Sequence, residues 1–144
     1  MNTKGMLAKE YFEKGYNCSQ AVALAFTKEL NMTEDAVKKA VIGFGGGFGR
    51  QRLVCGAVSG MTFVLGCIKS DGQDKLSIYK IIQDACNEIK QELGSLICAD
   101  LLEGKVKIET SFVPEERTTE YYKKRPCGEI VKFVADITQK YLNE

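Results

Sequence analysis

Residues 43–60 read GFGGGFGRQRLVCGAVSG, and the rest of the chain must be arranged around this stretch. Five of its first seven residues are glycines, which serve where the backbone takes a positive φ or approaches another group closely. An apolar run then opens at Cys55 and predicts a helix. A glycine-rich loop that feeds a helix leaves backbone N–H groups and the positive end of the helix dipole beside that cysteine. We therefore expect Cys55 to be the most reactive thiolate.

On both sides of this stretch, apolar residues recur at three- and four-residue steps, the pattern of amphipathic helices. Asn17 is a suitable N-cap with Gln20 at the capping-box position, and Gly94 is a suitable C-cap. Asp71-Gly72 is a helix stop. The pattern predicts helices at residues 6–15, 18–30, 34–41, 55–69, 73–93 and 126–141, a short apolar segment at 95–102, and a polar loop with one helical turn at 104–124.

The fold that follows is an all-α, single-domain helical bundle covering residues 1–144, because no stretch alternates as a β-strand does. Residues 55–69 are apolar on nearly every side, so this helix is expected to be central. Its small residues, Gly56 and Gly60 among them, would let a neighbouring backbone come close. The glycine-rich loop stands directly before this helix.

Composition excludes several kinds of function. The net charge of +1 gives no electrostatic footprint for nucleic acid. No apolar run approaches the ~18 residues of a membrane span, and no signal peptide opens the chain, so we expect a cytoplasmic protein. Histidine is absent, which excludes Ser-His and Cys-His nucleophiles and mixed Cys/His zinc sites. Six cysteines in a reducing compartment favour catalysis or metal binding over structural disulfides.

The cysteines divide into two groups. Cys67 and Cys86 fall on apolar helix positions, where free cysteine acts as a small hydrophobic side chain. The other four stand at breaks in the helical pattern, three in the first turn of a predicted helix and one just after a helix end. A helix N-terminus lowers the pKa of a thiol and makes the thiolate both nucleophile and ligand. The candidate catalytic and metal-binding residues are therefore Cys55, then Cys18 and Cys127, then Cys98.

The glycines have two interpretations. They can line a cofactor site, for which the candidates are Gly45, Gly46, Gly47, Gly49, Gly56 and Gly60, or they can form a tight helix crossing. A dinucleotide fingerprint is excluded, because Phe48, Arg50 and Arg52 occupy its third glycine position and no strand precedes the loop. We expect Phe44 and Phe48 to fill the core. The charged residues at 115–117 and 121–125 are expected to form solvated surface.

These features together resemble the C-GCAxxG-C-C family, whose label denotes redox-active proteins. The resemblance rests on Cys18 within YNCSQ, the GFGGGFG loop, the CGAVSG block of residues 55–60, Cys98 and Cys127. The label writes glycine before the second cysteine, whereas here Gly56 follows Cys55. The resemblance implies a redox-active or metal-binding protein and assigns no reaction.

Three kinds of site remain open. The four cysteines could hold an iron–sulfur cluster, with Arg50, Arg52 and Arg125 offsetting its charge, or a structural zinc ion. The chain lacks the Cys-x-x-Cys pairs usual in both, which favours a reversible disulfide or a mixed thiol–metal role, and four cysteines allow three pairings. An oxidoreductase or electron-transfer protein with an unidentified redox partner follows. The alternative is a non-catalytic zinc-binding or interaction module, and apolar helix faces leave room for a homodimer.

Overall fold

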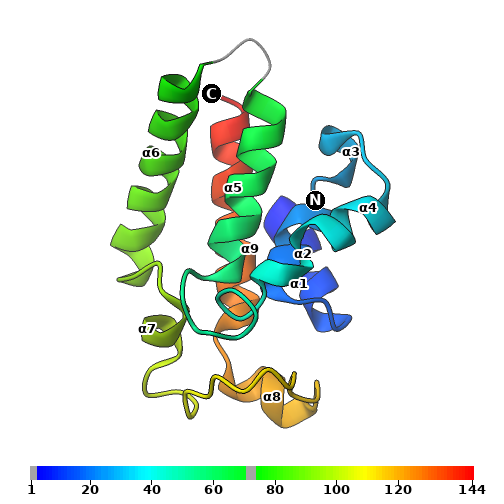
Figure 1. Ribbon diagram of the computed structural model, residues 1–144, viewed down its shortest axis with the longest axis vertical. Helices are drawn as coiled ribbons and strands as arrows, with labels where there is room; N and C mark the ends of the chain where they lie inside the picture. Colours follow the sequence, from blue (N-terminus) through cyan, green and yellow to red (C-terminus); the bar gives the residue numbers. More distant parts are fainter. Residues whose placement is uncertain (1–2, 71–73) are drawn as a thin grey trace.

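The chain is all-α, as predicted, in a computed structural model that describes residues 3–70 and 74–144 (Figure 1). The described residues contain no β-strand. None of their helices combines the length and apolar character needed to cross a membrane. The elements are α1 Lys4–Glu13, α2 Cys18–Leu24, α3 Thr27–Leu30, α4 Glu34–Val41, the 3₁₀ turn η1 Ile42–Phe44, α5 Gly56–Lys69, α6 Lys75–Leu93, α7 Cys98–Leu102, α8 Thr119–Lys124 and α9 Cys127–Leu142.

Three long helices run alongside one another, and in Figure 1 the upper part of α9 is seen between α6 and α5, partly covered by α5. α5 packs against α9, α6 and α2, and α1 packs against α9 and α2. α5 and α9 both begin at the lower end of Figure 1, where the glycine-rich loop, α7 and α8 also lie. Fully buried side chains between the helices include Phe12, Phe26, Met61, Leu65 and Ile89. The predicted central position of α5 is confirmed.

The start of α2 is fixed by the predicted capping box. The Asn17 side chain accepts a hydrogen bond from the Gln20 N–H at 2.9 Å, and the Gln20 side chain accepts one from the Asn17 N–H at 3.1 Å. Two further bonds tie this turn to the end of α4 and the start of η1: Ser19 Oγ donates to the Val41 carbonyl at 2.7 Å, and Asn17 Nδ2 donates to the Ile42 carbonyl at 3.0 Å. Cys18 is therefore held in one position, because its neighbours on both sides are anchored.

Small residues let α5 cross α2 at close range. A Cβ atom built on Gly60 would lie 2.8 Å from the Ser19 carbonyl oxygen, and one on Gly56 would lie 3.0 Å from the Phe44 carbonyl and 3.3 Å from Cys18 Cβ. Only glycine fits at both positions without displacing backbone. The expected close approach is confirmed, and it brings the first turn of α5 against Cys18.

The glycine-rich loop takes an unusual left-handed path. Gly46, Gly47, Phe48, Gly49 and Arg50 are consecutive residues with φ between 61° and 75°. Within the loop, the Gly49 N–H donates to the Gly43 carbonyl at 2.9 Å. Glycine adopts this conformation freely, whereas Phe48 and Arg50 do so at a cost in free energy. The expectation that Phe48 fills the core is wrong: its side chain is 41% exposed, while Phe44 is half-buried against the core.

Backbone pairing joins the residues before α5 to those before α7. The Cys55 N–H donates to the Leu96 carbonyl at 2.8 Å, and the Cys98 N–H donates to the Leu53 carbonyl at 2.6 Å. These bonds surround a single antiparallel bridge between Val54 and Ile97. Cys55 and Cys98 are thus neighbours although 43 positions separate them in the chain.

Other predicted boundaries differ in detail. The predicted helix at 18–30 breaks after Leu24 and resumes as α3 at Thr27, whose hydroxyl donates to the Leu24 carbonyl at 2.7 Å. Cys67 was expected in the core but is exposed, and Cys86 is half-buried. The predicted stop at Asp71-Gly72 lies outside the described residues.

Gly60→Ala tests the close helix crossing. The added methyl group meets the Ser19 backbone, and we expect this overpacking to lower the free energy of unfolding by about 1–3 kcal/mol. Gly66→Ala on the same helix is the matched control, because a Cβ there meets nothing within 4 Å. It should keep stability or raise it by up to about 1 kcal/mol. Urea unfolding followed by circular dichroism compares the two, and equal stabilities would contradict the proposed packing.

Candidate functional site

The four candidate cysteines all stand at helix starts. Cys18, Cys98 and Cys127 are the first residues of α2, α7 and α9, and Cys55 is the N-cap of α5. All four line one pocket of about 500 Å³. Cys67 and Cys86 do not line it. Sequence positions 18, 55, 98 and 127 thus converge on one place, through the helix crossing and the backbone pairing described above.

Cys18 and Cys127 are the two cysteines whose thiols affect each other's pKa most. The two thiols interact with each other, and this interaction shifts their pKa values in opposite directions. The Cys18 thiol, helped by Arg125, Arg117 and Arg52, lowers the pKa of Cys127 from 9.0 to about 7 against the effect of burial. The same interaction, together with burial, raises the pKa of Cys18. Cys127 is therefore the thiolate of the pair and Cys18 the S–H donor.

Cys55 has the helix geometry that the sequence predicted but not the predicted acidity. The N–H groups of Ala57 and Val58, in the first turn of α5, lie close enough to its sulfur to lower its pKa. Burial outweighs them and raises the pKa from 9.0 to about 12. The amides that reach Cys55 belong to the helix and not to the glycine-rich loop. Among the six cysteines, Cys127 is the only one whose pKa is lowered.

Cys98 lies against a buried arginine. Arg52 Nη1 donates to Cys98 Sγ at 3.7 Å, and Arg52 is only 6% exposed. Burial raises the pKa of Cys98 more than this arginine lowers it. Cys98 thus remains a thiol at neutral pH, with a guanidinium group beside it.

Charged side chains also line the pocket, which corrects one expectation. The segment around Arg117 and Arg125 was predicted to be solvated surface, yet Arg117, Tyr121, Glu115 and Arg125 all line the pocket, and Arg125 is 9% exposed. The Tyr121 ring lies near both guanidinium groups, at 4.7 Å from Arg117 and 4.6 Å from Arg125. The sequence carried one signal for this arrangement. Tyr121 lies four positions from each of the two arginines, and the face of an aromatic ring attracts a guanidinium group.

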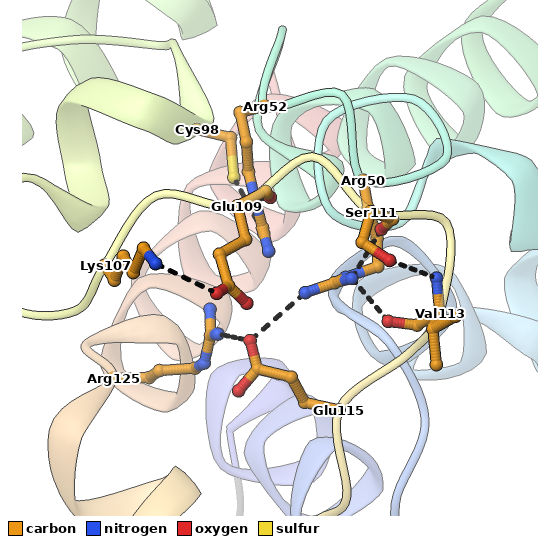
Figure 2. A network of polar contacts seen from close by, with 9 residues as sticks. All are labelled: Arg50, Arg52, Cys98, Lys107, Glu109, Ser111, Val113, Glu115 and Arg125. Atoms are coloured by element: carbon orange, nitrogen blue, oxygen red, sulfur yellow. Dashed lines mark hydrogen bonds and ion pairs between the residues drawn. The ribbon is translucent and has the colours of Figure 1, made fainter.

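An irregular segment, residues 103–118, crosses the pocket and is held by arginines (Figure 2). Arg52 Nε donates to the Glu109 carbonyl at 2.9 Å. Arg50 donates to the Ser111 and Val113 carbonyls and pairs with the Glu115 carboxylate at 3.1 Å. Arg125 pairs with the same carboxylate. In Figure 2, Glu115 therefore bridges two guanidinium groups.

The candidate glycines divide by position. Gly45, Gly46, Gly49 and Gly56 line the pocket. Gly47 instead packs against the backbone of Arg52 and Leu53, and Gly60 packs against Ser19. Gly47 and Gly60 therefore allow two backbone segments to come close together.

The pocket has the donor chemistry for soft metal ions but not the arrangement for a single one. Thiolates suit zinc and iron–sulfur clusters. Within residues 3–70 and 74–144, no three cysteine, aspartate or glutamate side chains meet closely enough to hold a metal ion. The four thiols thus surround a shared cavity without forming a mononuclear ligand set.

The comparisons with known proteins give a family for the chain but no individual relative. No curated protein and no solved structure matches the chain. A family model described as "Putative redox-active protein (C_GCAxxG_C_C)" matches residues 16–141, which include all four pocket cysteines and the glycine-rich loop. The chain belongs to the C-GCAxxG-C-C family.

Proposed function

We propose that the protein is a cytoplasmic thiol–disulfide oxidoreductase in which Cys127 and Cys18 are the exchanging pair. The observation that carries the proposal is that these two cysteines, each the first residue of a helix, come from distant parts of the sequence into one pocket, where each thiol shifts the pKa of the other. Dithiol chemistry needs one thiol that ionises readily and a second thiol within reach of it. The lowered pKa of Cys127 supports it as the first of these thiols, with Cys18 as the second.

The proposed reaction begins with the Cys127 thiolate. It attacks one sulfur of a disulfide substrate and forms a mixed disulfide, while the departing thiolate takes up a proton. Cys18 then loses its proton and attacks Cys127 Sγ, which expels the second substrate thiolate. The substrate gains two electrons and two protons, and the protein is left with a Cys18–Cys127 disulfide. A cellular thiol reductant reverses the sequence.

The residues around the pair support these roles of Cys127 and Cys18. Arg125, Arg117 and Arg52 stabilise the Cys127 thiolate electrostatically. Raised pKa values keep Cys55 and Cys98 protonated at neutral pH, so they do not compete with Cys127 as nucleophiles. A metal centre that uses all four cysteines is the competing function.

Thiol titration tests the ionisation. Because the pKa of Cys127 is lowered to about 7, its thiolate is present above that pH and is lost as the pH falls through it. The alkylation rate of this cysteine by iodoacetamide should therefore drop about tenfold for each pH unit below that midpoint. Cys18→Ala removes the S–H donor and should move the midpoint upward. Cys86→Ala, away from the pocket, should leave it in place. A midpoint unmoved by Cys18→Ala would contradict the pairing.

Oxidation tests the disulfide. Reduced protein treated with the neutral bis(2-hydroxyethyl) disulfide should lose two thiols per chain and yield a Cys18–Cys127 linkage identified by peptide mass spectrometry. Cys18→Ser should stop at the mixed disulfide on Cys127, because the second attack is abolished. Cys67→Ser should behave like the unaltered protein. A disulfide between any other two cysteines would contradict the assignment of Cys18 and Cys127 as the exchanging pair. The proposal would also fail if protein purified without oxygen held stoichiometric iron or zinc that every one of the four single Cys→Ser variants lost.

A further inference from the structure

The pocket concentrates positive charge in a chain that is almost neutral. The net charge of the whole chain is +1, yet the charged side chains lining the pocket are four arginines and one glutamate. Two of these arginines, Arg52 and Arg125, are 6% and 9% exposed. Buried charges are costly unless they are paired and hydrogen-bonded. The excess of guanidinium groups therefore calls for negative charge within the pocket.

One carboxylate of the protein already supplies part of this negative charge. Glu115 pairs with Arg50 at 3.1 Å and also with Arg125, as Figure 2 shows. Its side chain remains 38% exposed, and it comes from a segment without regular secondary structure. A carboxylate that is open to solvent and held by an irregular segment can exchange with a carboxylate from solution, because both make the same bonds to guanidinium.

Arg52 has bonding capacity left over. Its Nε donates to the Glu109 carbonyl, and its Nη1 donates to Cys98 Sγ. Among the described residues, its Nη2 has no hydrogen-bond partner. Arg50 and Arg52 both have a left-handed backbone conformation, with φ of 68° and 64°, and both line the pocket. The loop therefore presents two guanidinium groups close to the cysteines.

We propose that this pocket binds the carboxylate group of a small anionic disulfide or thiol, with Arg50, Arg52 and Arg125 as the recognition residues. Glu115 competes for the same arginines. A volume of about 500 Å³ is in the range of small-molecule pockets. The redox part of this substrate assignment rests on the proposed function, whereas carboxylate binding does not. The arginines that stabilise the Cys127 thiolate would also bring the substrate disulfide to it.

Suberate tests the binding site without any redox chemistry, because this dicarboxylate has the chain length of 3,3′-dithiodipropionate but no sulfur. Calorimetry at constant ionic strength should detect binding to the reduced full-length protein. Glu115→Gln removes the competitor and should tighten binding about tenfold, and Arg50→Gln should weaken it about tenfold. Glu116→Gln is the matched control: it changes the net charge equally, but Glu116 does not line the pocket. Its effect should stay below about twofold.

A charge series tests the substrate class. The probes are dianionic 3,3′-dithiodipropionate, neutral bis(2-hydroxyethyl) disulfide and dicationic cystamine, which are similar in size. Each rate of Cys127 exchange is divided by the rate of the same disulfide with free 1-thioglycerol, a neutral thiol that none of the probes contains, which removes intrinsic reactivity. The normalised rates should fall from anion to cation by about tenfold or more, and Arg50→Gln should flatten the series.

The outcomes separate the two proposals. Equal normalised rates, or suberate affinities that change alike in Glu115→Gln and Glu116→Gln, would overturn the carboxylate site and leave the thiol chemistry intact. Absence of exchange with all three disulfides, together with suberate binding that Glu115→Gln tightens, would overturn the thiol chemistry and support the carboxylate site. Failure of suberate to bind both the unaltered protein and Glu115→Gln would overturn the site directly.

Discussion

The close crossing of α2 and α5 is the constraint on which the rest of the structure depends. Gly56 and Gly60 let the first turns of these helices touch through their backbones, and the Asn17 capping box holds the α2 side of the contact rigid. The crossing brings Cys18 against the start of α5. A side chain on α5 at either glycine would push the two helix starts apart, and the pocket between them would lose its geometry.

Much of this arrangement could be predicted from local signals in the sequence. Helix periodicity, the Asn17–Gln20 capping box and the Gly94 C-cap are local signals, and each is found in the structure. The break after Leu24 was missed, because the apolar pattern of the sequence continues across it. Long-range features could not be predicted: the pairing of Cys55 with Leu96 joins segments whose separate patterns give no sign of each other.

The thiols show the same division between local and long-range effects. The helix N-terminal positions of Cys18, Cys55 and Cys127 were readable from the sequence, whereas Cys98 was placed only after a helix end and in fact begins α7. Their pKa values were not readable, because burial and neighbouring charges come from the assembled fold. Burial raises the pKa of Cys55 despite its helix amides, whereas Cys127 gains a thiol partner and arginines from three separate places in the chain. Tertiary environment thus decides which of four similar positions ionises.

The arginine contacts across the pocket also set an order of assembly during folding. Arg50 and Arg52 reach the carbonyls of Ser111 and Glu109 across 61 and 57 residues of chain. Residues 103–118 are mostly exposed, so apart from these arginine bonds little buried apolar surface holds them against the helices. We therefore expect the helical core to form first and residues 103–118 to dock last. Until that step, the reactive thiols of a newly made chain lie open, so its redox surroundings during synthesis determine which sulfurs are still free when the pocket closes.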